Sequence, residues 1–243
     1  MKLTVRGVPD RPVALLIHPA LTGPAYFDGI AEALGGRYRL ALPTLDGHYD
    51  HGPDFAGVAR SADELAHHLR AEGIAHVELL LGVGLGANVG LRLLADLPRG
   101  SVRRAVFDGA ALGTSGLRRA AQLRRMRKIA KAAREKKPGV ARNLVDSRDE
   151  EYAALVVDQA RAASDATLDA IATACNDTPE LPPLPEALQG FVTFTWGSYD
   201  QNARYARRVG EAYPRALIVM KRGLPPHSNL LNNPEHYVEE FLT

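Results

Sequence analysis

Short apolar runs alternate with longer segments of helical spacing through the first 111 residues of this 243-residue chain. Segments whose apolar residues recur every three or four positions separate these runs, and several of them end at glycine or proline. Strands that alternate with helices in this way are typical of a parallel sheet with helices on both faces. We therefore predict an α/β fold built on a mostly parallel, twisted sheet. The apolar runs are residues 13–17, 38–42, 77–81 and 102–107.

The alternation stops near residue 112. Residues 112–188 contain no convincing strand pattern, and they have the pattern of several helices with proline-containing breaks. Apolar runs return at residues 191–196 and 216–220. A helical insertion of this size has too small a core of its own, so it has to pack on the α/β domain. We predict a core of residues 1–111 and 189–243, with residues 112–188 as an inserted helical cap or lid.

The apolar run at residues 77–81 leads into Gly82-Val83-Gly84-Leu85-Gly86, and a helical pattern follows. This is the context of the G-x-S-x-G nucleophile elbow, in which a serine lies between a strand and a helix. Its flanking residues are small because strand and helix approach closely, and its central residue has a strained backbone conformation. Gly82 and Gly86 match the flanks. Gly84 holds the nucleophile position, and it has no side chain that can attack a substrate.

A glycine-rich turn between a strand and a helix has two other interpretations. It could bind a dinucleotide, but the G-x-G-x-x-G pattern would end at Ala87, which is a weak match, and it would follow the third clear strand instead of the first. It could also be a close helix–sheet crossing with no chemistry.

Two downstream residues favour the hydrolase interpretation. Asp200 follows the apolar run at residues 191–196, and His227 lies on the loop after the run at residues 216–220. With the order nucleophile position, acid, histidine, the chain resembles the α/β-hydrolase superfamily over nearly its whole length. The resemblance implies hydrolysis of an ester, thioester or amide through an acyl-enzyme, without a cofactor. Asp200 would orient His227, and His227 would take the proton from a serine at position 84.

The resemblance also implies an oxyanion hole. His18-Pro19-Ala20 looks like the His-Gly-x turn of the superfamily, with Pro19 in place of the glycine. The backbone N–H groups of Ala20 and Leu85 would then bind the oxyanion. Three further residues are predicted to contact substrate around the pocket: His18, His48 and Tyr49.

Gly84 is the main departure from this pattern. The run Gly82-Val83-Gly84-Leu85-Gly86-Ala87 also resembles the elbow of the N-myc downstream-regulated proteins, a branch regarded as non-catalytic. The predicted function is therefore that of a pseudo-hydrolase, or of an engineered inactive variant, that binds a small acyl-type molecule. Two alternatives stay open: a ligand-binding or scaffold protein on the same fold, and a non-hydrolytic lyase or cyclase that uses His227 as base.

A histidine-rich segment at residues 46–51 has features of a metal site. Asp46-Gly47-His48-Tyr49-Asp50-His51 resembles the H-x-H-x-D-H run of metallo-β-lactamase-type hydrolases, with Asp46 in place of the first histidine. Imidazoles and carboxylates at this spacing suit zinc. That fold, however, has antiparallel sheets and further ligands downstream, whereas this run follows a predicted parallel strand. We predict no metal.

Positive charge is concentrated in the predicted cap. Residues 116–142 hold eleven Lys and Arg but a single acid, Glu135, in a chain of net charge +2. We predict that the run from Arg118 to Arg142 is mostly solvent-facing, and that it binds no nucleic acid specifically because it lacks aromatic residues for base stacking. The alternative is a surface for an anionic substrate, partner or lipid headgroup.

The remaining sequence features concern the cellular location of the protein. No apolar run reaches the roughly 18 to 20 residues that a transmembrane helix needs, and the first residues lack the pattern of a signal peptide. One cysteine, Cys175, excludes an internal disulfide. These observations predict a cytoplasmic protein with a small-molecule ligand, and they leave its oligomeric state open.

Overall fold

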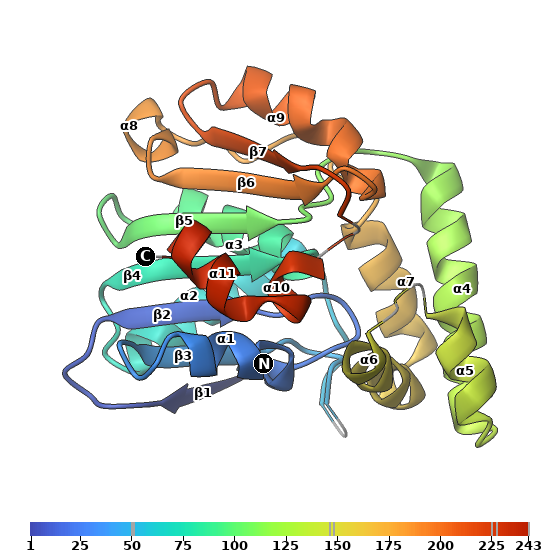
Figure 1. The fold of residues 1–243 in the computed structure, drawn as a ribbon. Helices are drawn as coiled ribbons and strands as arrows, with labels where there is room; N and C mark the ends of the chain where they lie inside the picture. The colour runs from blue at the N-terminus through green and yellow to red at the C-terminus, as the bar shows by residue number, and fades with distance from the viewer. Residues whose placement is uncertain (50–51, 146, 148, 225, 227, 243) are drawn as a thin grey trace.

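The computed structural model describes residues 1–49, 52–145, 147, 149–224, 226 and 228–242. Seven strands form one sheet in the order β1-β3-β2-β4-β5-β6-β7 (Figure 1). All neighbouring strands run parallel except β1, which pairs antiparallel with β3. The predicted, mostly parallel sheet is confirmed. The strands are β1 (Lys2–Arg6), β2 (Val13–Ile17), β3 (Arg39–Thr44), β4 (Val77–Val83), β5 (Val102–Asp108), β6 (Val192–Gly197) and β7 (Leu217–Lys221).

Helices cover both faces of the sheet, which is why its central strands read as continuous apolar runs. Every residue of β2 is buried, and one residue of β4 is half-buried while the others are buried. On one face lie α1 (Asp28–Ala33), α10 (Ser228–Asn232) and α11 (Pro234–Tyr237), and on the other lie α2 (Val58–Ala71) and α3 (Leu85–Asp96) (Figure 1). Five further helical segments are η1 (Pro24–Phe27), α8 (Glu186–Gln189), η2 (Gln201–Tyr205), α9 (Ala206–Ala212) and η3 (Val238–Leu242).

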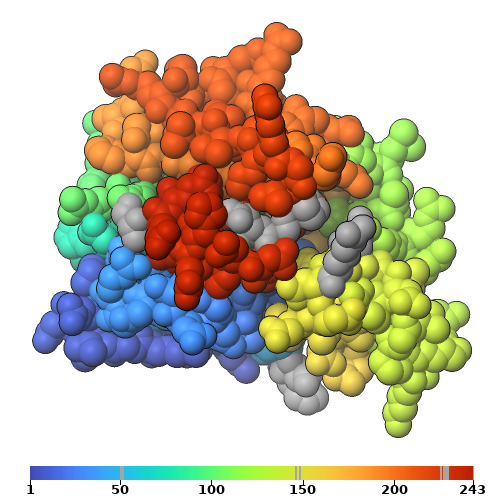
Figure 2. All heavy atoms as spheres, viewed as in Figure 1, coloured from blue at the N-terminus to red at the C-terminus, as the bar shows by residue number. Residues whose placement is uncertain are grey.

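Four of the helices that lie between β5 and β6 in the chain are placed beyond the carboxyl ends of the parallel strands (Figure 1). They are α4 (Gly116–Arg134), α5 (Pro138–Leu144), α6 (Glu150–Ala162) and α7 (Asp165–Ala174). Figure 2 shows this segment beside the C-terminal helices, on the face where those helices lie against the N-terminal part of the chain. The helices occupy the place that the predicted cap requires, and the division into core and cap stays a prediction.

A buried asparagine joins these helices to the sheet. The Asn88 side chain, on α3, donates to the carbonyl oxygens of Ala111 and Ala174, each at 3.0 Å, and accepts from the Ala111 N–H at 3.0 Å. Ala111 precedes the first of the four helices and Ala174 ends the last one. The chain just before α4 and at the end of α7 is therefore held against α3, the helix that follows Gly84. Among the described residues, no helix combines the length and apolar character needed to span a membrane.

Candidate active site

Gly84 lies at the turn between β4 and α3, with a φ of 54° and a ψ of −113°. Residues that carry a side chain rarely adopt a positive φ of this kind, and they are strained when held there, whereas glycine is not. The Gly84 N–H donates to the carbonyl oxygen of Asp108 at 2.8 Å, and the Gly84 carbonyl oxygen accepts from the Ala87 N–H at 3.1 Å. The turn is therefore tied both to the neighbouring strand and to its own helix. Position 84 thus forms a sharp turn between strand and helix, and its assignment as a nucleophile elbow stays a prediction.

The glycines on either side of Gly84 allow the close crossing of helix and sheet. A Cβ atom added at Gly82 would lie 2.5 Å from the carbonyl oxygen of Gly86. A Cβ atom added at Gly86 would overlap the carbonyl oxygen of Ile17, on β2, and would lie 2.7 Å from that of His18. All of these neighbours are backbone atoms. The small residues of this motif follow from the distance between strand and helix.

A cavity of about 590 Å³ lies beside this turn. The loop after β2, the first turn of α3, the segment after β6 and one face of α4 line it. Four residues predicted for the site are brought together there: Ala20, Gly84, Leu85 and Asp200. Leu85 is the first residue of α3, and the first N–H groups of a helix have no acceptor within the helix. Its N–H therefore fits the predicted oxyanion role, which stays a prediction, as does that of Ala20.

Asp200 follows β6 and is buried, with a relative exposure of 6%. Its carboxylate oxygen Oδ1 accepts from the backbone N–H of Asn202 at 2.8 Å, so one oxygen is held by the start of η2. His227 lies outside the described residues. The predicted pairing of Asp200 with His227, and the approach of His227 to Gly84, stay predictions.

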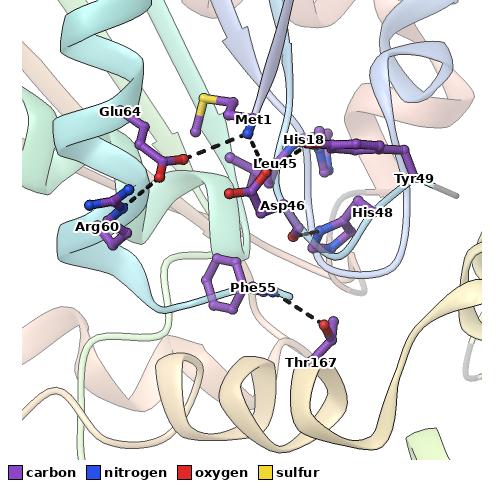
Figure 3. Close-up of polar contacts among 10 residues, drawn as sticks. All are labelled: Met1, His18, Leu45, Asp46, His48, Tyr49, Phe55, Arg60, Glu64 and Thr167. Carbon is purple, nitrogen blue, oxygen red and sulfur yellow. Dashed lines mark hydrogen bonds and ion pairs between the residues drawn. The ribbon is translucent and has the colours of Figure 1, made fainter. Parts of the chain in front are cut away.

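His18 is fully buried and does not line this cavity. Its Nε2 atom accepts from the Leu45 N–H at 3.1 Å (Figure 3). The proton therefore lies on Nδ1, which is 2.9 Å from the carbonyl oxygen of Pro19. Its ring contacts that of His48 edge-on, with centroids 4.9 Å apart. Burial, and then the nearby His48, lower the pKa of His18 to about 3. The His18 ring therefore joins the loop after β2 to Leu45, the residue that follows β3, and its predicted contact with substrate stays a prediction.

His48 and Tyr49 line a different cavity, of about 580 Å³, between the loop after β3 and α6. The Tyr49 hydroxyl donates to Asp46 Oδ1 at 3.0 Å, and His48 Nδ1 lies 3.0 Å from the Asp46 carbonyl oxygen (Figure 3). Burial raises the pKa of Tyr49 to about 12. The structure does not bring these two residues together with Gly84, so their predicted contact with the same substrate lacks support from the geometry.

The run from Asp46 to His51, which resembles a zinc-binding motif, belongs to the same loop after β3. Within the described ranges, no group of three or more His, Cys, Asp or Glu side chains is placed to hold a metal ion. Asp46 is instead engaged by the Met1 amino group and the Tyr49 hydroxyl (Figure 3). Asp50 and His51, the last two residues of that run, lie outside the described residues.

Comparison with solved structures identifies the architecture. A protein assigned to the alpha/beta hydrolase family from Desulfitobacterium hafniense is 22% identical, with a TM-score of 0.70, over 98% of this chain and 97% of that one. A carboxylesterase structure from Nitrososphaera gargenis has a TM-score of 0.74 at 17% identity, over 98% and 92% of the two chains. The chain has the α/β-hydrolase fold. An esterase from Thermogutta terrifontis, solved with malate bound, has a TM-score of 0.73 at 18% identity, over 98% and 90%. No protein-family model and no curated protein sequence matches the chain.

Within this α/β-hydrolase fold, sequence reasoning missed a buried ion pair next to the turn. Lys221 Nζ, at the end of β7, lies 3.1 Å from Asp108 Oδ2, at the end of β5, and both side chains are buried. The Tyr237 hydroxyl donates to the same oxygen at 3.1 Å. The backbone carbonyl of Asp108 also accepts a hydrogen bond from the Gly84 N–H. The ion pair between Lys221 and Asp108 therefore helps to hold the turn at Gly84 in place. A charged residue at the end of an apolar run was the only available signal in the sequence.

We expect Lys221→Met to lower the free energy of unfolding by about 3 kcal/mol, because it leaves the Asp108 carboxylate buried without its ammonium partner. Urea unfolding followed by circular dichroism measures the change. The double variant Asp108→Asn/Lys221→Met should recover most of the loss, and Arg222→Met, next in the chain and exposed, should have little effect. Equal effects of Lys221→Met and Arg222→Met would refute a stabilising role for the pair.

The two buried histidines predict how stability depends on pH. Burial lowers the pKa of His48 to about 4, as it lowers that of His18 to about 3. The unfolded chain binds protons at these residues near pH 6.5, whereas the folded chain does not. The contribution of the two neutral histidines to the free energy of unfolding is therefore complete above pH 6.5. It is lost as the pH falls toward their folded-state pKa values of about 4 and about 3. Between pH 7 and pH 5, each histidine should reduce the free energy of unfolding by about 1 to 2 kcal/mol.

Urea midpoints at pH 7, 6 and 5 test this dependence. His48→Gln should remove about half of the pH slope, because one of the two shifted groups is gone. His67→Gln is the matched control, since His67 is exposed on α2, and it should leave the slope unchanged. A flat profile in the unmodified chain would contradict the buried neutral state of these histidines.

Proposed function

We propose that this chain binds a small acyl-type molecule (an ester, thioester or amide) in the cavity beside Gly84, at a site of serine-hydrolase type that lacks its nucleophile. The observation that carries the proposal is the conformation of Gly84. A strand-to-helix turn with a positive φ opens onto a cavity at this position, and the residue there has no side chain.

The parent chemistry assigns a role to each residue of the site. A serine at position 84 would attack the acyl carbon, and His227 would take its proton and return it to the leaving group. Asp200 would orient His227. The N–H groups of Ala20 and Leu85 would stabilise the oxyanion. The fold neighbours are esterases and other hydrolases, which supports this class of chemistry as the origin of the site.

Without the nucleophile the acyl-enzyme cannot form, and removal of a catalytic nucleophile lowers turnover by about 10³- to 10⁶-fold. We therefore propose ligand binding with almost no hydrolysis for the chain as it stands. The cap of residues 112–188 would close over the bound ligand and set its shape. A cytoplasmic location and the absence of a specific nucleic-acid partner belong to the same proposal.

Two measurements on the unmodified chain test this function. Turnover of p-nitrophenyl butyrate should not exceed that of a His227→Ala variant. Titration with ethyl butyrate, followed by ¹H–¹⁵N NMR, should shift the backbone amides of Ala20 and Leu85 and leave that of Tyr49, at the other cavity, in place. Turnover at ordinary enzymatic rates would overturn the proposed lack of hydrolysis. A ligand that shifts amides around Tyr49 alone would overturn the assigned cavity.

A further inference from the structure

One face of the cap helix α4 forms part of the wall of the cavity beside Gly84. The residues on this face recur three and four positions apart, which places them on the same side of a helix. They are Arg118, Ala121, Gln122 and Arg125. The basic run is therefore not wholly directed to solvent, because two of its arginines line the candidate site.

Arg118 is held in a defined position at this wall. Its guanidinium group donates to the backbone carbonyl oxygen of Gln201 at 3.2 Å and to Asn202 Oδ1 at 3.1 Å. It also lies over the ring of Tyr205, 5.9 Å from the centroid. Asn202 is the residue whose N–H binds the Asp200 carboxylate. Arg118 is thus fixed beside the predicted catalytic acid without being bonded to it.

The charge of Arg118 is not compensated by these contacts, since an amide oxygen and a backbone carbonyl are both neutral. In the described part of the chain, no carboxylate lies within ion-pair distance of Arg118, whereas its neighbour Arg119 pairs with Asp169 at 3.2 Å. A guanidinium group has five N–H donors, and the two bonds leave donors available. Arg118 is half-buried, so its charge is less screened than that of an arginine in open solvent.

We propose that the ligand of this cavity carries a carboxylate, and that Arg118 binds it while the acyl group lies beside Gly84. The ligand class is then a small dicarboxylate half-ester, or the corresponding thioester or amide. Guanidinium and carboxylate form strong, charge-assisted hydrogen bonds, and a cavity of about 590 Å³ is of ordinary size for a small ligand. The excess of cations in residues 116–142 would attract such an anion to the cap. This inference rests on the proposed function, because it assigns a ligand to the same site.

Calorimetric titration of the unmodified chain with monoethyl succinate and diethyl succinate tests the inference. The half-ester should bind at least about tenfold more tightly than the neutral diester, which corresponds to 1.4 kcal/mol. Arg118→Gln should remove this preference and leave binding of the diester unchanged. Arg118→Lys retains the charge and should keep part of the preference. The control is Arg127→Gln, which removes one charge from an exposed position of the same helix outside the cavity wall, and it should change either affinity less than twofold.

Three results would overturn the carboxylate assignment. Equal losses for both esters in Arg118→Gln would show that Arg118 only holds α4 against η2. Equal losses of half-ester binding in Arg118→Gln and Arg127→Gln would show a general charge effect. Equal affinity of the unmodified chain for the two esters would show that no carboxylate is recognised.

The activity of Gly84→Ser separates failure of this inference from failure of the proposed function. Hydrolysis of both esters with equal kcat/KM would contradict the carboxylate preference and leave the hydrolase-type site standing. A folded Gly84→Ser variant that neither binds nor hydrolyses either ester would contradict both.

Discussion

Gly84→Ser is expected to turn the chain into a measurable esterase, with kcat/KM for small activated esters at least about 10³-fold above that of the unmodified chain. The turn already has the φ of 54° and ψ of −113° of a strained elbow, so a side chain introduced there would extend from the sharp point of the turn. The cavity and the N–H of Leu85 are in place beside it. The strain of a non-glycine residue should cost about 1 to 3 kcal/mol of stability. Release of p-nitrophenol from acetate and butyrate esters measures the gain.

The matched control is Gly84→Ala, which introduces the same backbone strain and a Cβ atom but no hydroxyl. It should be as destabilised as Gly84→Ser and remain inactive. A second change, His227→Ala in the Gly84→Ser background, should reduce the gained activity, since the proton acceptor would be missing. If Gly84→Ser folds and a broad ester, thioester and amide panel shows no turnover, the hydrolase interpretation fails, and a ligand-binding or scaffold protein becomes the better account.

Gly86→Ala should have the largest effect on stability, lowering the free energy of unfolding by more than about 4 kcal/mol, at the extreme of single substitutions. The added Cβ atom would overlap the carbonyl oxygen of Ile17. That oxygen belongs to the end of a central strand, so it cannot move aside as a flexible side chain would. Relief requires α3 to shift away from β2, and this shift would disturb the Gly84 turn as well.

Gly139→Ala provides the comparison, because a Cβ atom at Gly139, in α5, would have nothing within 4 Å. It should change the free energy of unfolding by no more than about 1 kcal/mol, in the stabilising direction, since alanine favours helix over glycine. Urea unfolding of both variants measures the difference. Similar stabilities for Gly86→Ala and Gly139→Ala would contradict the close crossing of helix and sheet.

The sequence predicted those parts of the fold that depend on local patterns. The central strands were evident because strands covered on both faces are apolar throughout, as β2 is. The edge strand β1 was missed, since its residues alternate between exposed and half-buried and no continuous apolar run marks it. The turn between β4 and α3 could be placed at Gly84 because the glycine spacing reflects a short-range steric requirement between strand and helix.

Some residues predicted for the site line one cavity because of where the strands end. Asp200 and Leu85 reach the same cavity because the carboxyl ends of parallel strands lie at one edge of the sheet. His48 and Tyr49 line another cavity, since the path of the loop after β3 is not encoded in periodicity. The His18 ring is buried and accepts a hydrogen bond from the N–H of Leu45, 27 residues away in the chain. Only the folded chain shows that contact.

The position of Arg118 in the cavity wall was likewise hidden in the sequence. A run of charges on a helix is usually solvated, and which face of α4 turns inward depends on how α4, α5, α6 and α7 pack together. The contact of Arg118 with Gln201 and Asn202 joins segments more than 80 residues apart. The sequence could therefore indicate that residues 116–142 are basic, but not which arginines line the cavity beside Gly84.

Covalent labelling tests most directly whether position 84 is the nucleophile position of an otherwise assembled site. A fluorophosphonate reacts with an activated serine hydroxyl, and intact mass followed by peptide mapping locates the adduct. We expect Gly84→Ser to gain one adduct on the peptide that contains position 84, the unmodified chain to gain none, and His227→Ala in the Gly84→Ser background to label much more slowly. A folded Gly84→Ser variant that stays unlabelled, or an unmodified chain that labels equally fast at another residue, would contradict the assignment.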